Sequence, residues 1–330
     1  MGSLLSKTQR SGPIEYRNYP PGCVVCPEGV TPGNPGLFEA VHSKLDELNP
    51  NTFDGIRLRI NKSLSNHFSV NHTISMRPEP SSLKSFIEDE EDGYKFAASY
   101  QGTKRVNRER YPMLYGDITP RGTLRANFVH TLGCRFRVKL STQVTRNNRY
   151  RDLKATAEYR ANDATLSATL VDPCLLRREG VLLLQYLQAV TSRIALGAEI
   201  AYNRNSNVAG AQQTNIAGAL RYSTGFLTIS ATLGEAGARL CFHQIAGPQL
   251  LLGSEFKVNF VKPEAKGTVF YKVVLPRADL VFRAFVDSDW KIGAVFEKQL
   301  QPIAESTLLL CAVLDHGKKN MSIGIGLNIG

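Results

Sequence analysis

Apolar and polar residues alternate with a period of two from Phe53 to the C-terminus. Near that end, Ile323 and Ile325 alternate with Ser322 and Gly324. The same alternation recurs in residues 134–140, 165–170, 194–201 and 250–260. Successive side chains of a β-strand point to opposite faces, so each run predicts a strand with one apolar face and one polar face.

The alternation divides the chain into about nineteen segments of about ten residues, which is the length that a tilted membrane-spanning strand requires. These segments are 53–62, 66–77, 93–102, 111–119, 122–131, 134–145, 149–160, 163–171, 180–190, 193–204, 212–222, 225–233, 237–245, 249–260, 265–275, 278–288, 290–299, 306–315 and 319–329. An open sheet of this size would curl or split and would expose two edges, whereas closure into a barrel removes both. The pattern therefore predicts an all-β fold closed into a barrel of about nineteen strands.

The polar faces of these strands carry many charges. They include Arg57, Arg59, Lys95, Arg125, Arg135, Arg137, Lys139, Glu158, Arg160, Glu255, Lys257, Lys272, Asp279, Arg283 and Glu297. Side chains fill the interior of a small barrel, so charges on the inner face indicate a wide, water-filled lumen and an apolar face turned to lipid. The alternation alone leaves open a large soluble β-protein, with its charges outside and its apolar faces buried.

The first fifty residues follow other patterns. Residues 1–34 are rich in Pro, Gly, Ser and Tyr, which predicts a flexible extension. From residue 35 to residue 50, Phe38, Val41 and Leu45 recur at helical spacing, and Asn34 is suited to cap a helix there. We therefore divide the chain into an extension (1–34), an amphipathic helix (35–50) and a transmembrane barrel (51–330).

Charge and hydropathy restrict the partners and the cellular location of the protein. The net charge is +11, but Lys and Arg are spread along the chain, which disfavours a nucleic-acid partner. No segment reaches the roughly 18 consecutive apolar residues of a transmembrane helix. The first ten residues lack the pattern of a secretory signal or a mitochondrial presequence.

The sequence predicts no enzyme, no metal site and no cofactor. His67 and His72 differ in parity on one predicted strand, so they cannot share a metal ion. Cys23 and Cys26 form a lone CxxC without the further ligands of a zinc site, and we interpret them as free thiols. The cysteines are scattered, unlike the framework of a small disulfide-rich domain.

Several segments resemble a known family. They are 34–39, 64–73, 94–103, 116–117, 158–160 and 286–290. Together they are similar to the animal channel-forming subunits of the TOM preprotein translocase of the mitochondrial outer membrane, within the mitochondrial porin superfamily. The last strand also resembles the β-signal of mitochondrial barrels through Ser322, Gly324, Leu327 and Ile329.

This resemblance implies a nineteen-stranded barrel whose first and last strands are parallel, with the helix that carries Phe38, Val41 and Leu45 inside the lumen. It implies a multi-pass barrel surrounded by outer-membrane lipid. It also implies a dimer or larger complex with a receptor and small single-helix subunits. The implied function is the passage of unfolded precursor proteins and their presequences across the outer membrane.

Presequences are positively charged, so acidic groups in the lumen should attract them. Glu255 lies mid-strand, and Asp279 and Glu297 come together at one rim because they occupy the open end of a hairpin. These three residues are the predicted presequence path.

A basic track has the opposite sign. It consists of Arg57, Arg59, Arg125, Arg135, Arg137 and Lys139. These cations could hold the helix through Glu39, Asp46 and Glu47, or could separate basic from acidic tracks, and the sequence leaves both open. Basic lumen residues also suit the alternative function, a voltage-dependent anion-type metabolite porin of the same membrane.

Overall fold

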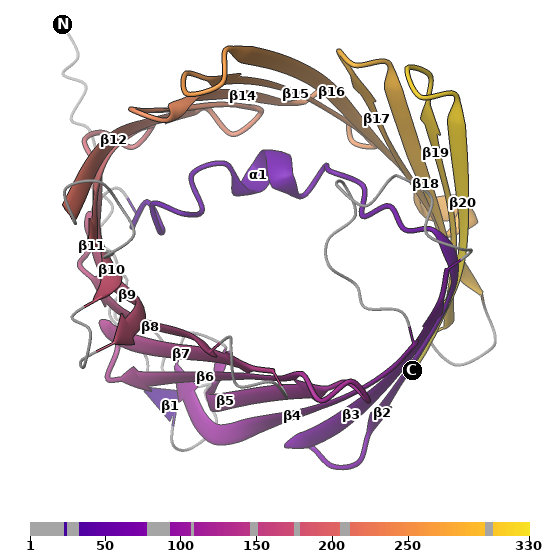
Figure 1. The fold of residues 1–330 in the computed structure, drawn as a ribbon, viewed down its shortest axis with the longest axis horizontal. Coiled ribbons are helices and arrows are strands. Elements are labelled where there is room, and N and C mark those ends of the chain that lie inside the picture. The colour runs from indigo at the N-terminus through magenta and orange to yellow at the C-terminus, as the bar shows by residue number, and fades with distance from the viewer. Residues whose placement is uncertain are drawn as a thin grey trace, which may run out of the picture.

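Strands β2 to β20 form a closed barrel around a wide lumen, and residues 34–54, which precede β2, lie inside it (Figure 1). This arrangement comes from a computed structural model, which describes residues 23–24, 33–77, 93–106, 109–145, 151–174, 179–204, 212–300 and 306–330. The predicted extension (1–34) lies almost entirely outside the described residues. Within it, β1 (Cys23–Val24) pairs in parallel with β4.

The barrel strands follow one another around the wall in chain order. They are β2 (Gly55–Ser63), β3 (Phe68–Met76), β4 (Gly93–Val106), β5 (Glu109–Ile118), β6 (Leu124–Leu132), β7 (Phe136–Val144), β8 (Arg151–Arg160), β9 (Ala164–Cys174), β10 (Glu179–Ala189), β11 (Ile194–Arg204), β12 (Gln212–Ser223), β13 (Leu227–Gly234), β14 (Gly237–Ile245), β15 (Leu250–Asn259), β16 (Glu264–Leu275), β17 (Leu280–Asp287), β18 (Lys291–Leu300), β19 (Ser306–Asp315) and β20 (Asn320–Ile329). The prediction of a nineteen-stranded barrel is confirmed, and most strand limits agree to within three residues.

The barrel closes between β2 and β20. Each strand is antiparallel to the next, so an odd number of strands leaves the first and the last running in the same direction. β2 and β20 therefore pair in parallel, from Gly55 opposite Gly324 to Ile60 opposite Ile329. Closure leaves no free edge along this stretch, which is what a wall in lipid requires.

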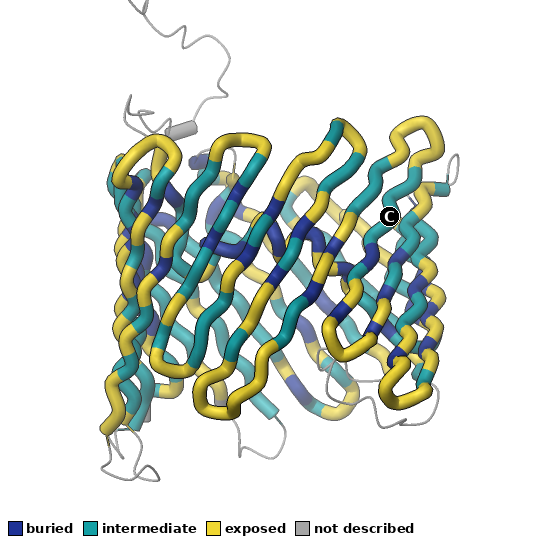
Figure 2. The backbone as a smooth tube through the Cα atoms, turned by 90° about the horizontal axis from the view of Figure 1, so that it is seen from above, coloured by how far each residue is buried: buried dark blue, intermediate teal, exposed yellow. Residues whose placement is uncertain are grey.

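The two faces of the wall differ as the alternation predicts (Figure 2). On β20, Ile323 and Ile325 point outward and are 56% and 49% exposed, whereas Ser322 on the inner face is 7% exposed. Most exposed large apolar side chains of the other strands follow the same outward parity, with Tyr115 and Ile245 as exceptions at inward positions. No helix among the described residues is long and apolar enough to cross a membrane.

β4 is longer than predicted. It continues to Val106, and its pairing with β5 shifts between Gln101 and Lys104. Gly102 lies in this bulge against the backbone of Tyr111, where a side chain would clash. A bulge inserts residues that break the two-residue period, so the alternation ends before the strand does.

The helix is shorter than predicted. α1 spans only Ser43–Asp46, is preceded by turns, and has no side-chain cap at its N-terminus. Asn34, the predicted cap, instead bonds to the barrel wall. Apolar spacing therefore identified the buried face of this segment, whereas contacts with the wall set its backbone conformation.

One rim, here called the terminal rim, carries the β8–β9 turn and the C-terminal Gly330. Even-numbered strands all end there because they run in the direction of β20. The amide nitrogen of Asn34 donates to the carbonyl oxygens of Ala161 and Ala164, which flank the β8–β9 turn. The chain therefore enters the lumen from the same rim at which it ends.

Candidate functional site: the lumen and its N-terminal lining

Residues 34–54, here called the luminal segment, run along the inner wall before joining β2 (Figure 1). Asn34 fixes the entry point. Its Nδ2 bonds the turn carbonyls at 2.8 and 3.2 Å, and its Oδ1 accepts from the Thr165 hydroxyl at 2.9 Å. The guanidinium of Arg221 donates to the Pro35 carbonyl. A single amide side chain thus ties the segment to β9 and to the β8–β9 turn.

Two apolar clusters hold the segment against the wall. Val41 is buried with Leu187, Ala195 and Ala219, and Phe38 packs on this cluster. Leu45 and Leu48 are buried with Cys241 of β14 and Phe270 of β16. Phe38, Val41 and Leu45 thus pack against lumen-facing residues of the wall.

Inward-facing glycines make room for these side chains. A Cβ on Gly197 of β11 would lie 3.0 Å from Phe38, and one on Gly253 of β15 would lie 2.7 Å from Leu48. Sequence reasoning missed both glycines. Their signal was present, because each occupies a polar-face position in the middle of a strand, where a glycine marks a close approach.

Polar contacts complete the docking. The His42 ring, 6% exposed, contacts the hydroxyls of Ser230 at 2.8 Å and Thr232 at 3.2 Å. Burial, and next the positive charge of Arg239, lower the pKa of His42 from 6.5 to about 4. The imidazole is therefore neutral at pH 7, in the form that can both donate and accept a hydrogen bond.

The end of the luminal segment clasps the seam between β20 and β2. The Phe53 amide donates to the Cys311 sulfur at 3.2 Å, and the thiol donates back to the Phe53 carbonyl at 2.8 Å. The Phe53 ring lies against Gly324 and Gly326, and the Arg57 guanidinium sits 4.1 Å above it. Phe53 was not predicted to have a role, because a single aromatic residue before a strand carries no periodic signal.

The β-signal residues divide between the two faces of this seam. Ser322 and Gly324 point into the lumen, and Leu327 and Ile329 point outward opposite Leu58 and Ile60. The space where a side chain of Gly324 would lie is filled by Phe53 of the luminal segment.

The predicted acidic path lies mostly within ion pairs. Glu255 is 8% exposed and contacts Arg239 at 2.5 Å and Lys257 at 2.9 Å. Glu297 accepts from Arg283 at 2.9 Å. Asp279 is exposed in the turn before β17, on the same rim as Glu297, as the hairpin argument predicts.

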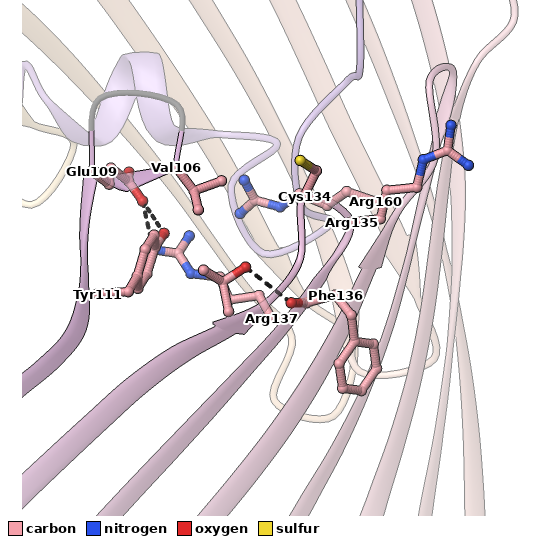
Figure 3. Close-up of a pocket in the computed structure, with 9 residues that line it drawn as sticks. Val106, Glu109, Tyr111, Cys134, Arg135, Phe136, Arg137 and Arg160 are labelled. Carbon is pink, nitrogen blue, oxygen red and sulfur yellow. Dashed lines mark hydrogen bonds and ion pairs between the residues drawn. The ribbon is translucent and has the colours of Figure 1, made fainter. Parts of the chain in front are cut away.

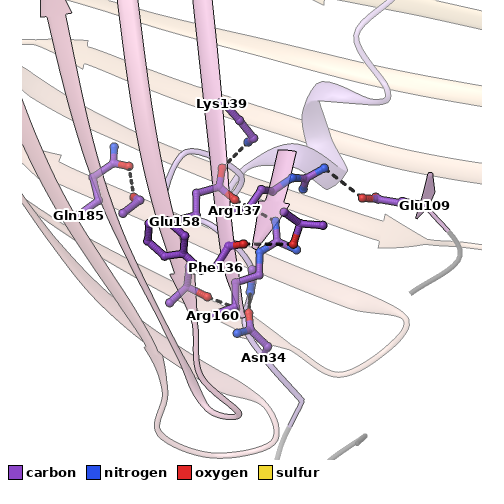
Figure 4. Close-up of polar contacts among 12 residues, drawn as sticks. Asn34, Glu109, Phe136, Arg137, Lys139, Glu158, Arg160 and Gln185 are labelled. Atoms are coloured by element: carbon purple, nitrogen blue, oxygen red, sulfur yellow. Dashed lines mark hydrogen bonds and ion pairs between the residues drawn. The ribbon is translucent and has the colours of Figure 1, made fainter. Parts of the chain in front are cut away.

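The basic track faces the lumen and is partly neutralised by wall acids (Figures 3 and 4). Arg137 pairs with Glu109 at 3.0 Å, and Lys139 pairs with Glu158. Arg125 donates to the Gln143 amide oxygen at 3.1 Å. Arg59 lies on the inner face of β2, and Arg135 lies in the β6–β7 turn.

The acids of the luminal segment bind other cations. Glu39 pairs with Lys154 of β8 at 3.3 Å, and Asp46 pairs with Arg239 of β14 at 2.6 Å. Lys154 and Arg239 both lie outside the basic track, so these two pairs are formed with other cations of the wall. Both carboxylates stay about half exposed, and Glu47 is also exposed. The segment thus presents acidic groups to the lumen, facing the basic wall of β4–β7.

Two further observations concern chemistry. Among the described residues, no group of three or more His, Cys, Asp or Glu side chains could hold a metal ion. Cys134 in the β6–β7 turn is disulfide-bonded, which the scattered cysteines did not predict. Cys241 and Cys311 are free and buried.

Comparison with known proteins identifies the family. The sequence profile of the eukaryotic porin family matches residues 34–326. This chain belongs to the eukaryotic porin family. A relative from Drosophila melanogaster, "Mitochondrial import receptor subunit TOM40 homolog 2", is 41% identical over 298 residues, covering 90% of this chain and 84% of its own.

Two further relatives carry similar names. The TOM40 homologue of Xenopus tropicalis is 35% identical over the full length of both chains, and the human one is 37% identical over 90% of this chain and 78% of its own. A solved Rhodopseudomonas blastica porin is 12% identical, with a TM-score of 0.46 over 64% of this chain and 89% of that one. That likeness adds nothing to the family assignment.

Proposed function

We propose that this chain is the channel through which unfolded precursor proteins cross the mitochondrial outer membrane. The supporting relatives are named mitochondrial import receptor subunits and match nearly the whole chain. The single observation that carries the proposal is the closed barrel with an apolar outer face and a charged lumen. An unfolded chain can cross such a lumen without exposing its backbone to lipid.

The family assignment indicates a transport channel, and we propose no enzymatic activity. We also propose that the chain works in a TOM complex, as a dimer or larger assembly with a receptor and small single-helix subunits. Purification in mild detergent, followed by identification of the co-purifying subunits, tests this. Recovery of the barrel alone from intact mitochondria would contradict it.

The proposed presequence path combines Glu255, Asp279 and Glu297 with the exposed acids of the luminal segment. Ion pairs hold Glu255 and Glu297 and so reduce their attraction for a passing cation. Each exposed charge contributes at most about 1 kcal/mol because water and salt screen it. Several acids must therefore act together.

The test compares two variants in isolated mitochondria. One replaces Glu255 and Glu297 by Gln and Asp279 by Asn, and the other replaces Glu39 and Glu47 by Gln. Import of presequence-bearing precursors should fall in both variants. Import of precursors that carry uncharged internal signals should fall less. Equal loss for both precursor classes would indicate barrel damage, and no loss for either would refute the acidic path.

The alternative is an anion-type metabolite porin, which the basic wall of β4–β7 favours. Planar-bilayer recordings separate the two functions. A protein-conducting channel should be blocked by a cationic presequence peptide in a voltage-dependent manner. A metabolite porin should be insensitive to the peptide and should prefer anions.

A further inference from the structure

A cavity of about 260 Å³ opens at the terminal rim, between the start of β5, the β6–β7 turn and the end of β8 (Figure 3). Arg135, Arg137 and Arg160 line it, and among the described residues Glu109 is the only lining carboxylate. Three guanidinium groups and one carboxylate therefore line the cavity. The proposed function does not use this cavity.

Two of the three arginines are held in place by wall residues. The Arg137 guanidinium contacts Glu109 at 3.0 Å and lies 5.4 Å above the Tyr111 ring, whose hydroxyl donates to the same carboxylate. Arg160 contacts the fully buried Glu158 at 3.1 Å (Figure 4). Each contact uses one terminal nitrogen, Nη2, and fixes the orientation of its guanidinium group before any ligand arrives.

The Nε nitrogens of the same two side chains take no part in these contacts. Within the described part of the chain, the Nε atoms of Arg137 and Arg160 are buried and have no hydrogen-bond partner. The same two guanidinium groups line the cavity, so an acceptor that enters it can form charge-assisted hydrogen bonds with them. The fork of a guanidinium group matches the spacing of oxygens in a phosphate or carboxylate group.

We propose that this cavity binds a phosphate group. The three guanidinium groups still outnumber the carboxylates of Glu109 and Glu158 that pair with two of them, which favours an anion. A phosphate group also presents enough oxygens for more than one arginine. The cavity is smaller than the 300–1,000 Å³ typical of sites for larger organic ligands, which favours a small anion. Binding would lower the positive charge that this rim presents to a cationic chain in the lumen.

The phosphate group can come from solution or from a lipid headgroup, because the rim lies at the edge of the barrel. Two measurements on the purified full-length protein distinguish the sources. The first follows thermal unfolding in zwitterionic detergent as inorganic phosphate is titrated against chloride at constant ionic strength. The second follows co-sedimentation with phosphatidic acid vesicles compared with phosphatidylcholine vesicles.

The expected result is a saturable rise in the unfolding midpoint with phosphate. Arg137→Lys combined with Arg160→Lys should raise the apparent Kd at least tenfold, because lysine keeps the charge and loses the fork. Arg283→Lys, a matched change in an ion-paired inward arginine of β17, should leave the Kd unchanged. If the double variant fails to fold, the exposed Arg135→Gln should still weaken binding at least threefold.

Saturable binding to phosphatidic acid vesicles, but not to free phosphate, would identify the lipid headgroup as the source if the lysine variants abolish it. Absence of binding in both measurements would overturn the proposal. Phosphate binding that the lysine variants and Arg135→Gln leave unchanged would also overturn it, because the anion would then occupy another place.

Discussion

Replacing Gly324 by alanine should destabilise the barrel through the luminal segment. A Cβ at this position would lie 2.8 and 2.9 Å from two carbons of the Phe53 ring, and still closer to the Phe53 carbonyl oxygen. Carbon atoms pack at about 3.5–4.0 Å, so Phe53 would have to move by about 1 Å. The amide and the carbonyl of Phe53 both form hydrogen bonds with the Cys311 thiol, which resist that movement.

Overpacking of this kind typically costs about 1–3 kcal/mol. We expect a loss of this size in the free energy of unfolding, measured by denaturant titration in detergent. Gly218→Ala is the matched control, because Gly218 faces outward on β12 and a Cβ there meets nothing within 4 Å. That control should change stability by less than about 0.5 kcal/mol.

A double-mutant cycle separates this explanation from a role in assembly. In a Phe53→Ala background the ring is gone, so Gly324→Ala should cost less, with a coupling of about 1 kcal/mol or more. The residual cost reflects the carbonyl oxygen, which remains. Additive effects of the two changes would refute the reasoning and would favour recognition of Gly324 as part of the β-signal during insertion.

Three further predictions concern the luminal segment. Lowering the pH should weaken its docking, because the pKa of His42 falls from 6.5 to about 4 on folding. The stability that depends on neutral His42 is complete above pH 6.5. It is lost progressively down to pH 4, by about 3 kcal/mol at most. His42→Asn should flatten the pH dependence of the unfolding free energy in that window, and an unchanged slope would contradict this origin. Asn34→Ala should cost about 1–3 kcal/mol of local stability, because it leaves the groups of the β8–β9 turn that bond to Asn34 without partners. The loss should appear as faster amide exchange in residues 35–42. Asn51→Ala, a change at an exposed residue, should leave the exchange unchanged. Deletion of residues 35–48 should raise single-channel conductance because the segment occupies the lumen, and an unchanged conductance would mean that it does not narrow the conducting path.

Local periodicity was sufficient to predict the wall. The alternation of Ile323 and Ile325 with Gly324 predicts which side chains face outward, because the direction of a side chain in a strand depends only on its parity. The exception is β4, where the bulge at Gly102 breaks the period and four residues of the strand were missed. The inward parity of Glu255 and Glu297 was also predictable, but their partners Arg239 and Arg283 were not identified.

The sequence by itself predicted about nineteen strands and the two faces of each, and the family resemblance implied the parallel pairing of the first and last strands. Only the tertiary structure decided which strands the luminal segment contacts, because these contacts join residues far apart in the chain. Asn34 meets Thr165, and Phe53 meets Cys311, at separations of 131 and 258 residues. No local pattern encodes such pairs, since they depend on the curvature of the closed wall. Gly253 shows the difference: its parity placed it inside the barrel, and only the packed structure shows that Leu45 and Leu48 fill the space above it.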